Sequence, residues 1–448
     1  MQPRTYGGQP MSDVLVGLLS IVGIILLIQG GMHVATALLL VSFAGIMLIK
    51  GDIEIAGSML AHAATDSIAV YSFGTIPLFV VMGLFVGISG IGRDTFDVAG
   101  QLFRFFKGGL GMATVAANAV FAAVNGTSIA SASVFTRVAV PELIRLGYTN
   151  RFSVGVVAGS SVLGMLIPPS LLLILFGIVA ETSIGDLFTG GIVPGLLLAL
   201  IYCVMIGAMA RFWPSFILNG TDDAAAGRSL MGVRTLAAKS APIVLLILVV
   251  LGGIYGGVFT PIEAGAVGAL CSLLLALWRR ALDWKTFAEV LTETGYVTAA
   301  ISFLIVAAHL YATLLAISGL PNAIANWAQA NNLGFWTIMV GYLVLILALG
   351  TILDSGSIVL ITVPLALPIV SAFGTDIIWF GVVTVIAVEV GLLTPPLGVA
   401  CFVVKANLQA QGITLGDVFA GSFPFVVAMT GTLALVTAFP WFVLAFVR

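Results

Sequence analysis

The sequence is poor in charged residues, and this scarcity excludes most soluble protein classes. Only 8% of its 448 residues are Asp, Glu, Lys or Arg, whereas a soluble domain carries about 25%. With 60% hydrophobic residues and a mean hydropathy of +1.20, the composition is typical of a chain that crosses a lipid bilayer several times. The formal net charge of −2 accompanies no dense basic patch, so no nucleic-acid partner is expected.

Residues that carry metal, redox or nucleotide chemistry are equally scarce. Cys203, Cys271 and Cys401 lie far apart in apolar segments and form no metal-binding or redox spacing. The three histidines form no cluster. No G-x-x-x-x-G-K-[ST] loop occurs, so this chain is not expected to use ATP directly. No nucleophile and base form a recognisable constellation, and we therefore do not expect an enzyme.

What the chain does contain is two long apolar regions, each with a polar interruption at its middle. They cover residues 108–146 and 333–373. The interruptions read Asn125-Gly126-Thr127-Ser128 and Leu353-Asp354-Ser355-Gly356-Ser357. Each region can be two membrane spans or one re-entrant hairpin whose tip stops inside the membrane. Unpaired backbone groups are not tolerated in hydrocarbon, so such breaks need protein or water around them.

The first interruption is suited to end one helix and begin another. Asn125 and Gly126 tolerate positive φ better than other residues, and Thr127 and Ser128 can cap the following helix. Carbonyl oxygens at the end of the first helix suit a hard cation such as Na⁺. Amide N–H groups at the start of the second helix suit a carboxylate.

Two double prolines repeat this device inside the apolar segments 150–181 and 376–410. Pro168-Pro169 precedes Ser170, and Pro395-Pro396 follows Thr394 and precedes Gly398. Proline lacks an N–H group and disfavours helix in the preceding residue, so the first half must stop and leave free carbonyls. Proline also suits the first turn of the next helix. Interrupted segments at matching places in two halves predict a transporter site.

Three of the ionisable residues in these segments call for an interpretation. Asp354 is the only carboxylate at an expected hairpin tip, so it is a functional candidate. Glu389 lies six residues before Pro395, and it either contributes to the site or is satisfied by a neighbour. We expect Arg137 to pair with Glu142 or to extend its guanidinium to the membrane interface.

The pattern divides the chain into an N-terminal scaffold (1–72), a first repeat (73–212), a cytoplasmic linker (213–238) and a second repeat (239–448). Single spans are predicted at 13–28, 33–49, 74–92, 186–210, 239–256, 261–278, 296–318 and 417–447. Segments 51–71, 93–107 and 283–294 are amphipathic and are predicted to lie in the interface. The last two are either simple connectors or lateral arms that join a fixed part to a moving part.

The distribution of basic residues predicts the orientation of the chain across the membrane. Most basic residues fall on one side of this map, namely Arg93, Arg104, Lys107, Arg145, Arg151, Arg211, Arg228, Arg234, Lys239, Arg279, Arg280, Lys285 and Lys405, against Arg4, Lys50 and Arg448 on the other. Positive residues collect in cytoplasmic loops. Both termini are therefore expected outside the cytoplasm, and the two hairpins are expected to enter from opposite faces, as in an inverted repeat.

At these motifs the chain resembles the large membrane subunit of TRAP transporters, the tripartite ATP-independent periplasmic family. The resemblance runs from about Met11 to the end. It rests on "NGTSIASASV", "VPELIRLGY", "GMLIPPSLLLILFGIVAETSIGDLFTGGIVPGLLLAL", "GGIYGGVFTPIEAGAVGAL", "GTILDSGSIVLITVPLALPIV" and "EVGLLTPPLGV". Many members have Ser-Gly-Ser where this chain has Asn125-Gly126-Thr127, Asp where Ser131 stands, and Asn where Ala387 or Ala400 stands.

The resemblance implies an all-α polytopic inner-membrane protein with two opposed re-entrant hairpins and two broken helices that moves as an elevator. It implies Na⁺-driven uptake of an organic acid, commonly a C4-dicarboxylate or sialic acid, with a small four-helix membrane subunit and a periplasmic binding protein as partners. Carried onto this sequence, Na⁺ sites fall at Asn125, Gly126, Pro168, Pro169, Asp354, Thr394, Pro395, Pro396 and Gly398. Carboxylate-contacting hydroxyls fall at Thr127, Ser128, Ser170, Ser355 and Ser357.

Three other readings compete with such an importer. The nearest is a stand-alone Na⁺-coupled carboxylate or anion transporter with the same hairpin architecture, which would need no partner subunits. An ion channel would need a ring or funnel of pore-lining polar groups, and the chain is sparse in them. A membrane enzyme would need converging catalytic groups, and none is apparent.

Overall fold

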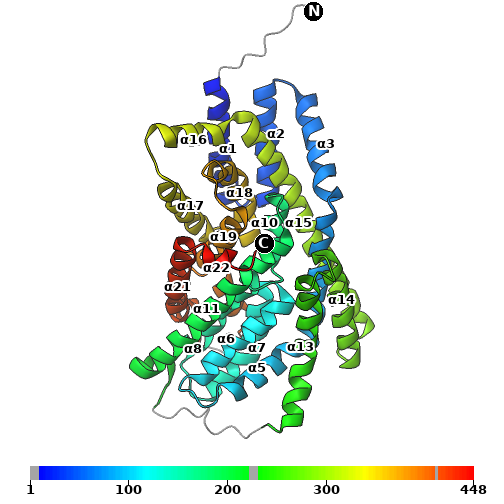
Figure 1. The fold of residues 1–448 in the computed structure, drawn as a ribbon, viewed down its shortest axis with the longest axis vertical. Helices are drawn as coiled ribbons and strands as arrows, with labels where there is room; N and C mark the ends of the chain where they lie inside the picture. The colour runs from blue at the N-terminus through cyan, green and yellow to red at the C-terminus, as the bar shows by residue number, and fades with distance from the viewer. Residues whose placement is uncertain (1–9, 221–230, 409–411, 448) are drawn as a thin grey trace, which may run out of the picture.

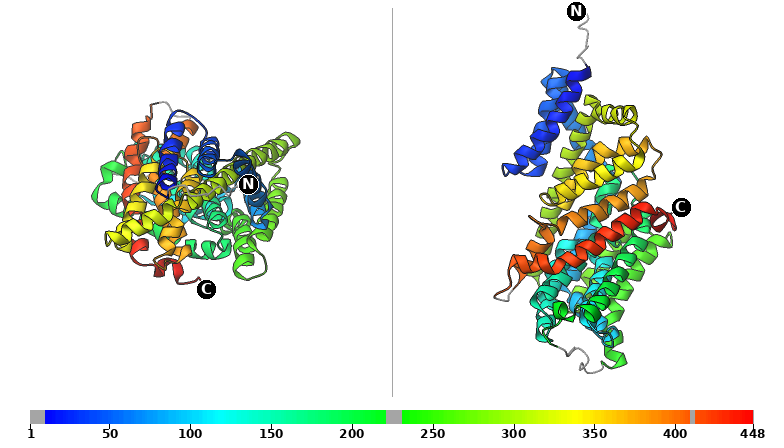
Figure 2. Two further views of the ribbon diagram at one scale, coloured as in Figure 1. Left: turned by 90° about the horizontal axis from the view of Figure 1, so that it is seen from above. Right: turned by 90° about the vertical axis from the view of Figure 1, so that its left-hand side faces the viewer.

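The computed structural model describes residues 10–220, 231–408 and 412–447, and within those ranges the chain is almost entirely helical (Figures 1 and 2). Of the charged residues in the map above, Arg4, Arg228 and Arg448 lie outside the described residues. The helices are α1 (Pro10–Gln29), α2 (Val34–Lys50), α3 (Ile53–Ala69), η1 (Tyr71–Gly74), α4 (Thr75–Ile88), α5 (Ile91–Leu102), α6 (Gly109–Asn125), α7 (Ser128–Arg145), α8 (Asn150–Ser161), α9 (Leu163–Leu166), α10 (Leu171–Val179), α11 (Ile184–Phe212), α12 (Pro214–Ile217), α13 (Val233–Tyr255), α14 (Pro261–Trp278), α15 (Trp284–Ser318), α16 (Leu320–Ala330), α17 (Phe335–Gly350), α18 (Ser355–Ser371), α19 (Ile377–Leu392), α20 (Val399–Asn407), α21 (Leu415–Ala438) and α22 (Trp441–Leu444).

Six helices of the described chain are long and apolar enough to cross a membrane, and a seventh span results if α8 to α10 are taken together. The axes on either side of the Pro168-Pro169 break differ by 41°. The sequence therefore correctly predicts an all-helical protein with several apolar helices and a broken span at this position.

The two interrupted apolar regions form pairs of packed helices, α6 with α7 and α17 with α18. Each of these helices has 16 to 18 residues, which corresponds to about 24–27 Å at 1.5 Å per residue. A hydrocarbon core is about 30 Å thick. Helices this short favour hairpins that turn inside the membrane over pairs of full spans.

The hairpins lie on opposite sides of the central helices α10 and α19. In Figure 1, α17 and α18 lie on one side, α6 and α7 on the other, and α10 and α19 lie between them. Within each half the hairpin packs on its own broken helix, α6 and α7 on α8 and α9, and α17 and α18 on α19. The halves also meet each other, because α10 packs on α18 and α19.

A tight contact joins the start of the first broken helix to the last long helix. A Cβ added at Gly421 of α21 would lie 1.9 Å from the carbonyl oxygen of Arg151 in α8, so only glycine allows this approach. Next to it, Arg151 Nε lies 2.9 Å from Asp417 Oδ1. Residues 266 positions apart in the chain thus form one packed unit.

The predicted boundary between an amphipathic segment 283–294 and a span 296–318 is wrong. Residues 284–318 form the single helix α15 of 35 residues, because Gly295 alone is tolerated inside a helix at a cost of only about 1 kcal/mol. The amphipathic helix that precedes the second hairpin is instead α16, which is not among the predicted segments. Both α5 and α16 follow a left-handed glycine, Gly90 and Gly319, so they occupy equivalent places in the two repeats.

Two other ends differ from expectation. The amphipathic segment 93–107 is helical only to Leu102. The predicted span 417–447 stops at Ala438, because Pro440 follows and proline disfavours helix in the residue before it. The segment 51–71 forms α3, which ends at Ala69 before the extended residue Val70, and η1 then leads directly into α4.

Candidate functional site

The first break brings the hairpin tip and the broken helix into direct backbone contact. Helix α6 ends at Asn125, and Gly126 follows with a φ of 71°. The Gly126 carbonyl accepts a hydrogen bond from Leu171 N, the first residue of α10, at 3.0 Å. A Cβ at Gly126 would lie 2.6 Å from the Pro169 carbonyl oxygen. Glycine is required here both by its φ and by the close approach.

Three polar side chains hold this first break in shape. Thr127 caps α7 by accepting from Ala130 N at 3.4 Å, and the Asn125 side-chain amide donates to the Thr127 carbonyl at 3.1 Å. Ser170 caps α10 by accepting from Leu173 N at 3.2 Å and donates to the Met165 carbonyl. Residues 161–170 are all buried.

The second break repeats the same backbone contact between different residues. Thr351 follows the last residue of α17, and its carbonyl accepts from Leu397 N at 3.2 Å. Asp354 caps α18 by accepting from Ser357 N at 3.1 Å, and it also accepts from the Ser357 hydroxyl. Thr394 donates to the Val390 carbonyl at 2.8 Å. In both repeats the backbone just after the hairpin's first helix is thus bonded to the backbone just after the double proline.

The two breaks also touch each other. Ser355 at the second tip lies against Met165 in the first broken helix, with its Oγ 3.5 Å from the sulfur. The peptide bonds Pro168–Pro169 and Pro395–Pro396 are both cis. The structure therefore gathers the predicted site residues into two neighbouring, similarly built groups, one in each repeat.

Some local details of the prediction are wrong. Asn125 stays in the helical region, and only Gly126 takes a positive φ. The prolines do not occupy the first turn of the next helix. Helix α10 begins at Leu171 after Ser170, and α20 begins at Val399 after the left-handed Gly398. A proline pair followed by a capping residue or glycine leaves an unwound stretch, which a single proline at the first turn would not.

Glu389 lies in the middle of α19 with no exposed surface. Neither carboxyl oxygen has a hydrogen bond of normal geometry within the described part of the chain. The side chains that interact with it are Ser128, the first residue of α7, and Tyr202 of α11, whose hydroxyl is also unpartnered. Of the two expectations for Glu389, a position beside the first break agrees with this placement.

Arg137 does not pair with Glu142. Glu142 instead pairs with Arg145, one turn away on the same helix, at 2.6 Å. The Arg137 guanidinium reaches across to Asn407 at the end of α20, with Nη2 at 2.7 Å and Nε at 3.2 Å from Oδ1. A partner 270 residues away cannot be identified from local spacing.

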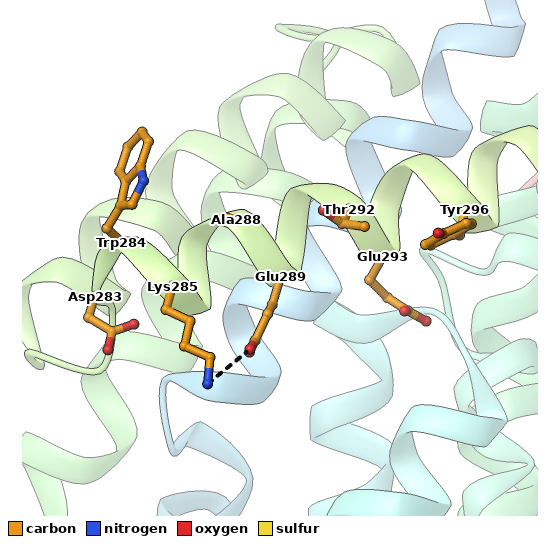
Figure 3. A pocket seen from close by; sticks show the side chains of 8 residues that line it. All are labelled: Asp283, Trp284, Lys285, Ala288, Glu289, Thr292, Glu293 and Tyr296. Atoms are coloured by element: carbon orange, nitrogen blue, oxygen red, sulfur yellow. Dashed lines mark ion pairs between the residues drawn. The ribbon is translucent and has the colours of Figure 1, made fainter.

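Two sizeable hollows lie away from the breaks. One, of about 850 Å³, is an open groove along the first half of α15, with Trp284 and Tyr296 at its ends and Lys285 3.9 Å from Glu289 (Figure 3). The other, of about 800 Å³, lies between α3, α10 and α15 and contains Asp66, Glu181 and His309. Neither contains a tip residue, and no group of three potential metal-ligating His, Cys, Asp or Glu side chains exists among the described residues.

Residues 21–442 match the family model of the tripartite ATP-independent periplasmic transporter, DctM component. The chain belongs to this family. It is 34% identical over 375 residues to the C4-dicarboxylate TRAP transporter large permease protein DctM of Pseudomonas aeruginosa, which covers 83% of this chain and 84% of the relative. It is 30% identical to the sialic acid TRAP transporter large permease protein SiaM of Vibrio cholerae, with 95% and 97% coverage.

Solved transporter structures share the fold of this TRAP large permease. The YdaH transporter of Alcanivorax borkumensis superposes with a TM-score of 0.61 at 14% identity, covering 88% of this chain and 90% of that one. At this identity the likeness concerns the fold alone. The family assignment confirms the resemblance seen in the motifs, and it makes the chain a multi-pass membrane permease, since its relatives are named as transporter permeases.

Proposed function

We propose that this TRAP large permease imports an organic acid, a C4-dicarboxylate, sialic acid or a similar carboxylate, and couples the import to Na⁺. The observation that carries the proposal is the pair of similarly built breaks. Each one brings two unwound backbone stretches together inside an apolar protein. The substrate class is that of the relatives' printed names, C4-dicarboxylate and sialic acid.

The chemistry of helix ends supports both ligands. The ends of α6, α9, α17 and α19 release carbonyl oxygens, which carry partial negative charge and suit a hard cation such as Na⁺. The starts of α7, α10 and α18 offer N–H groups that suit a carboxylate. Ser128, Ser170 and Ser355 lie at or just before these starts. A cation and an anion thus have complementary places in each repeat.

The family implies the rest of the assembly. A periplasmic binding protein would capture the acid, and a small four-helix membrane subunit would pair with the permease. We place the complex in the bacterial inner membrane with both permease termini in the periplasm, since the basic residues then face the cytoplasm. We also propose that the hairpins and broken helices move together as an elevator.

Reconstitution into proteoliposomes tests the coupling. The permease, with its partner subunit and binding protein, is supplied with labelled substrate under an inward Na⁺ gradient, an inward H⁺ gradient or no gradient. We expect uptake only with Na⁺. Full uptake in the absence of Na⁺ contradicts the proposal, and uptake without the binding protein and small subunit favours a stand-alone transporter.

Cysteines at the two tips test the motion. Single cysteines replace Ser128 and Ser355 in a background without Cys203, Cys271 and Cys401, and an impermeant thiol reagent is applied from each side. An elevator alternates the side from which each tip is labelled when Na⁺ and substrate are added. Identical labelling of both tips under every condition contradicts the elevator.

A further inference from the structure

We infer that Arg137 and Asn407 form a carboxylate-binding subsite between α7 and α20, separate from the two breaks. The subsite lies in a cavity of about 340 Å³ whose lining includes Thr136, Val140 and Ile144 of α7 and Leu408 after α20. The inference rests on the proposed function only in that it takes the bound acid to be the transported substrate.

The first step concerns an overloaded acceptor. Asn407 Oδ1 receives hydrogen bonds from Arg137 Nη2 at 2.7 Å, Arg137 Nε at 3.2 Å and Ser133 Oγ at 3.0 Å. An amide oxygen has two lone pairs, so three donors exceed its capacity. The amide cannot turn to relieve this, because its Nδ2 donates to the Val403 carbonyl at 3.0 Å. The cavity therefore has more donors than its protein acceptor can satisfy.

The second step concerns charge. In the described chain, Arg145, Arg151, Lys239 and Arg279 each pair with a carboxylate. Among the residues that the structure describes, the Arg137 guanidinium hydrogen-bonds only to the neutral amide of Asn407 and forms no ion pair. Lys405, on the same helix as Asn407, donates to the Ile413 carbonyl at 2.6 Å, which is also neutral. The end of α20 thus carries positive charge that described acidic side chains do not neutralise.

The third step concerns position. Arg137 lies nine residues after Ser128 on α7, which is about 14 Å along the helix axis. Ile129, Ser133 and Arg137 follow each other at four-residue spacing, and Ile129 and Arg137 are exposed. This row leads from the first tip to the cavity. Arg137 lies halfway along α7, between the tip and the end of the hairpin that we place on the cytoplasmic side. An acid that leaves the breaks toward the cytoplasm would therefore meet its guanidinium.

Arginine suits this role because its planar group binds a carboxylate through two parallel N–H bonds. The apolar walls Val140 and Ile144 would contact the hydrocarbon part of the acid. A small mono- or dicarboxylate fits a cavity of this size, whereas an uncharged ester would leave the guanidinium unpaired.

The competing explanation is that Arg137 merely joins α7 to α20. The variant Asn407→Asp distinguishes the carboxylate-binding subsite from a purely structural link, because it places a carboxylate of the same shape next to the Arg137 guanidinium. A stapling role predicts that N407D keeps or raises the unfolding temperature and keeps the anion response. A carboxylate site predicts that N407D retains stability but loses the anion response, since the new carboxylate occupies the guanidinium.

The experiment measures the shift in unfolding temperature of the purified full transporter with succinate, acetate or uncharged dimethyl succinate, at constant Na⁺ and ionic strength set with chloride. We expect succinate and acetate to stabilise the wild type and the ester to have no effect. Arg137→Gln and N407D should each weaken the succinate midpoint at least tenfold, and Arg137→Lys should fall between. Arg145→Gln, on the same helix but paired with Glu142, should match the wild type.

Transport gives an independent readout. In proteoliposomes, R137Q should raise the half-saturating concentration of succinate applied on the cytoplasmic side at least tenfold. The half-saturating concentration of succinate delivered by the binding protein should stay unchanged. No response of the wild type to either acid, a wild-type response in both R137Q and N407D, or equal stabilisation by chloride overturns the inference. If the wild type shows no Na⁺-driven uptake, the proposed function is overturned instead of this inference. Binding of the acid to Arg137 does not depend on Na⁺-driven uptake.

Discussion

The two breaks share one backbone design but differ in how much of them is covered. In the first, Asn125, Gly126 and all of residues 161–170 are buried. In the second, Asp354, Pro395, Pro396 and Leu397 are exposed. The backbone contact is nonetheless the same in both. The difference shows that the hydrogen-bonded frame forms independently of the surrounding packing, and that coverage is a separate property of each repeat.

The first break is buried by helices that lie outside its own hairpin. Helix α4 packs on α6, and α11 packs on both α6 and α9. At the second break, the apolar side chains of Ile352 and Leu397 remain 38% and 43% exposed. We interpret the first break as the more rigid one and the second as the one whose surroundings change when ligands or partners are present.

Gly126→Ala should have the largest effect, since it disrupts the first break, which is buried. The new Cβ would meet the Pro169 carbonyl at 2.6 Å at a left-handed φ, and the two costs together are about 3 kcal/mol of unfolding free energy. Thermal unfolding of the purified permease measures this. Gly374→Ala is the control, because Gly374 has a φ of +70° but no atom within 4 Å of its added Cβ. Equal losses in both variants would show that the close approach contributes nothing.

Asp354→Asn lies at the second, more exposed break. It should change the Na⁺ dependence of transport and leave the stability of the permease unchanged. Asn and Asp are equally good helix caps, so the unfolding free energy should change by less than about 0.5 kcal/mol. If Na⁺ binds at this tip, loss of the charge should raise the half-saturating Na⁺ concentration for transport about tenfold, equivalent to about 1.4 kcal/mol. Asp376→Asn, which changes the capping carboxylate of α19, should leave it unchanged. Matching Na⁺ curves for D354N and wild type would remove Asp354 from the coupling site.

Ser170→Ala should have a smaller effect on the unfolding free energy. Comparing it with the loss of an exposed serine cap isolates the contribution of burial. Ser170 caps α10 inside the covered break, whereas Ser183 caps α11 from an exposed position. Losing the buried cap also leaves buried backbone groups unpaired. We expect S170A to lose about 1 kcal/mol more unfolding free energy than S183A. Equal losses in chemical denaturation would mean that water reaches the first break.

The sequence predicts the breaks well because their cause is local. Double proline, glycine and capping hydroxyls act on the backbone within a few residues, so the ends of α6, α9, α17 and α19 follow from the residues beside them. Three of the four hairpin helices, α6, α17 and α18, contain no charged residue, and this is equally visible in the sequence. The predictions that hold therefore concern features that a short window of residues determines.

The remaining features depend on residues far apart in the chain. Arg137 meets Asn407 across 270 residues, and Glu389 meets Ser128 from the other repeat. The predicted end of the span at Ser318 agrees with the end of α15, but the continuity of α15 through Gly295 and the helix α16 were missed for another reason. Gly319 takes the left-handed conformation that ends a helix, whereas Gly295 remains helical, and only the surrounding structure decides between them. The different coverage of the two breaks is likewise a product of packing by α4 and α11.

The contact between α8 and α21 has a consequence for biosynthesis. Arg151 and Asp417 are 266 residues apart, and a ribosome adds about 5–20 residues per second. The first broken helix therefore waits about 13–53 seconds after its synthesis before the helix that packs on it emerges. During this interval α8 exposes the small-residue surface on which Gly421 will rest. Chains that terminate before residue 415 lack α21 and leave that surface without its packing partner.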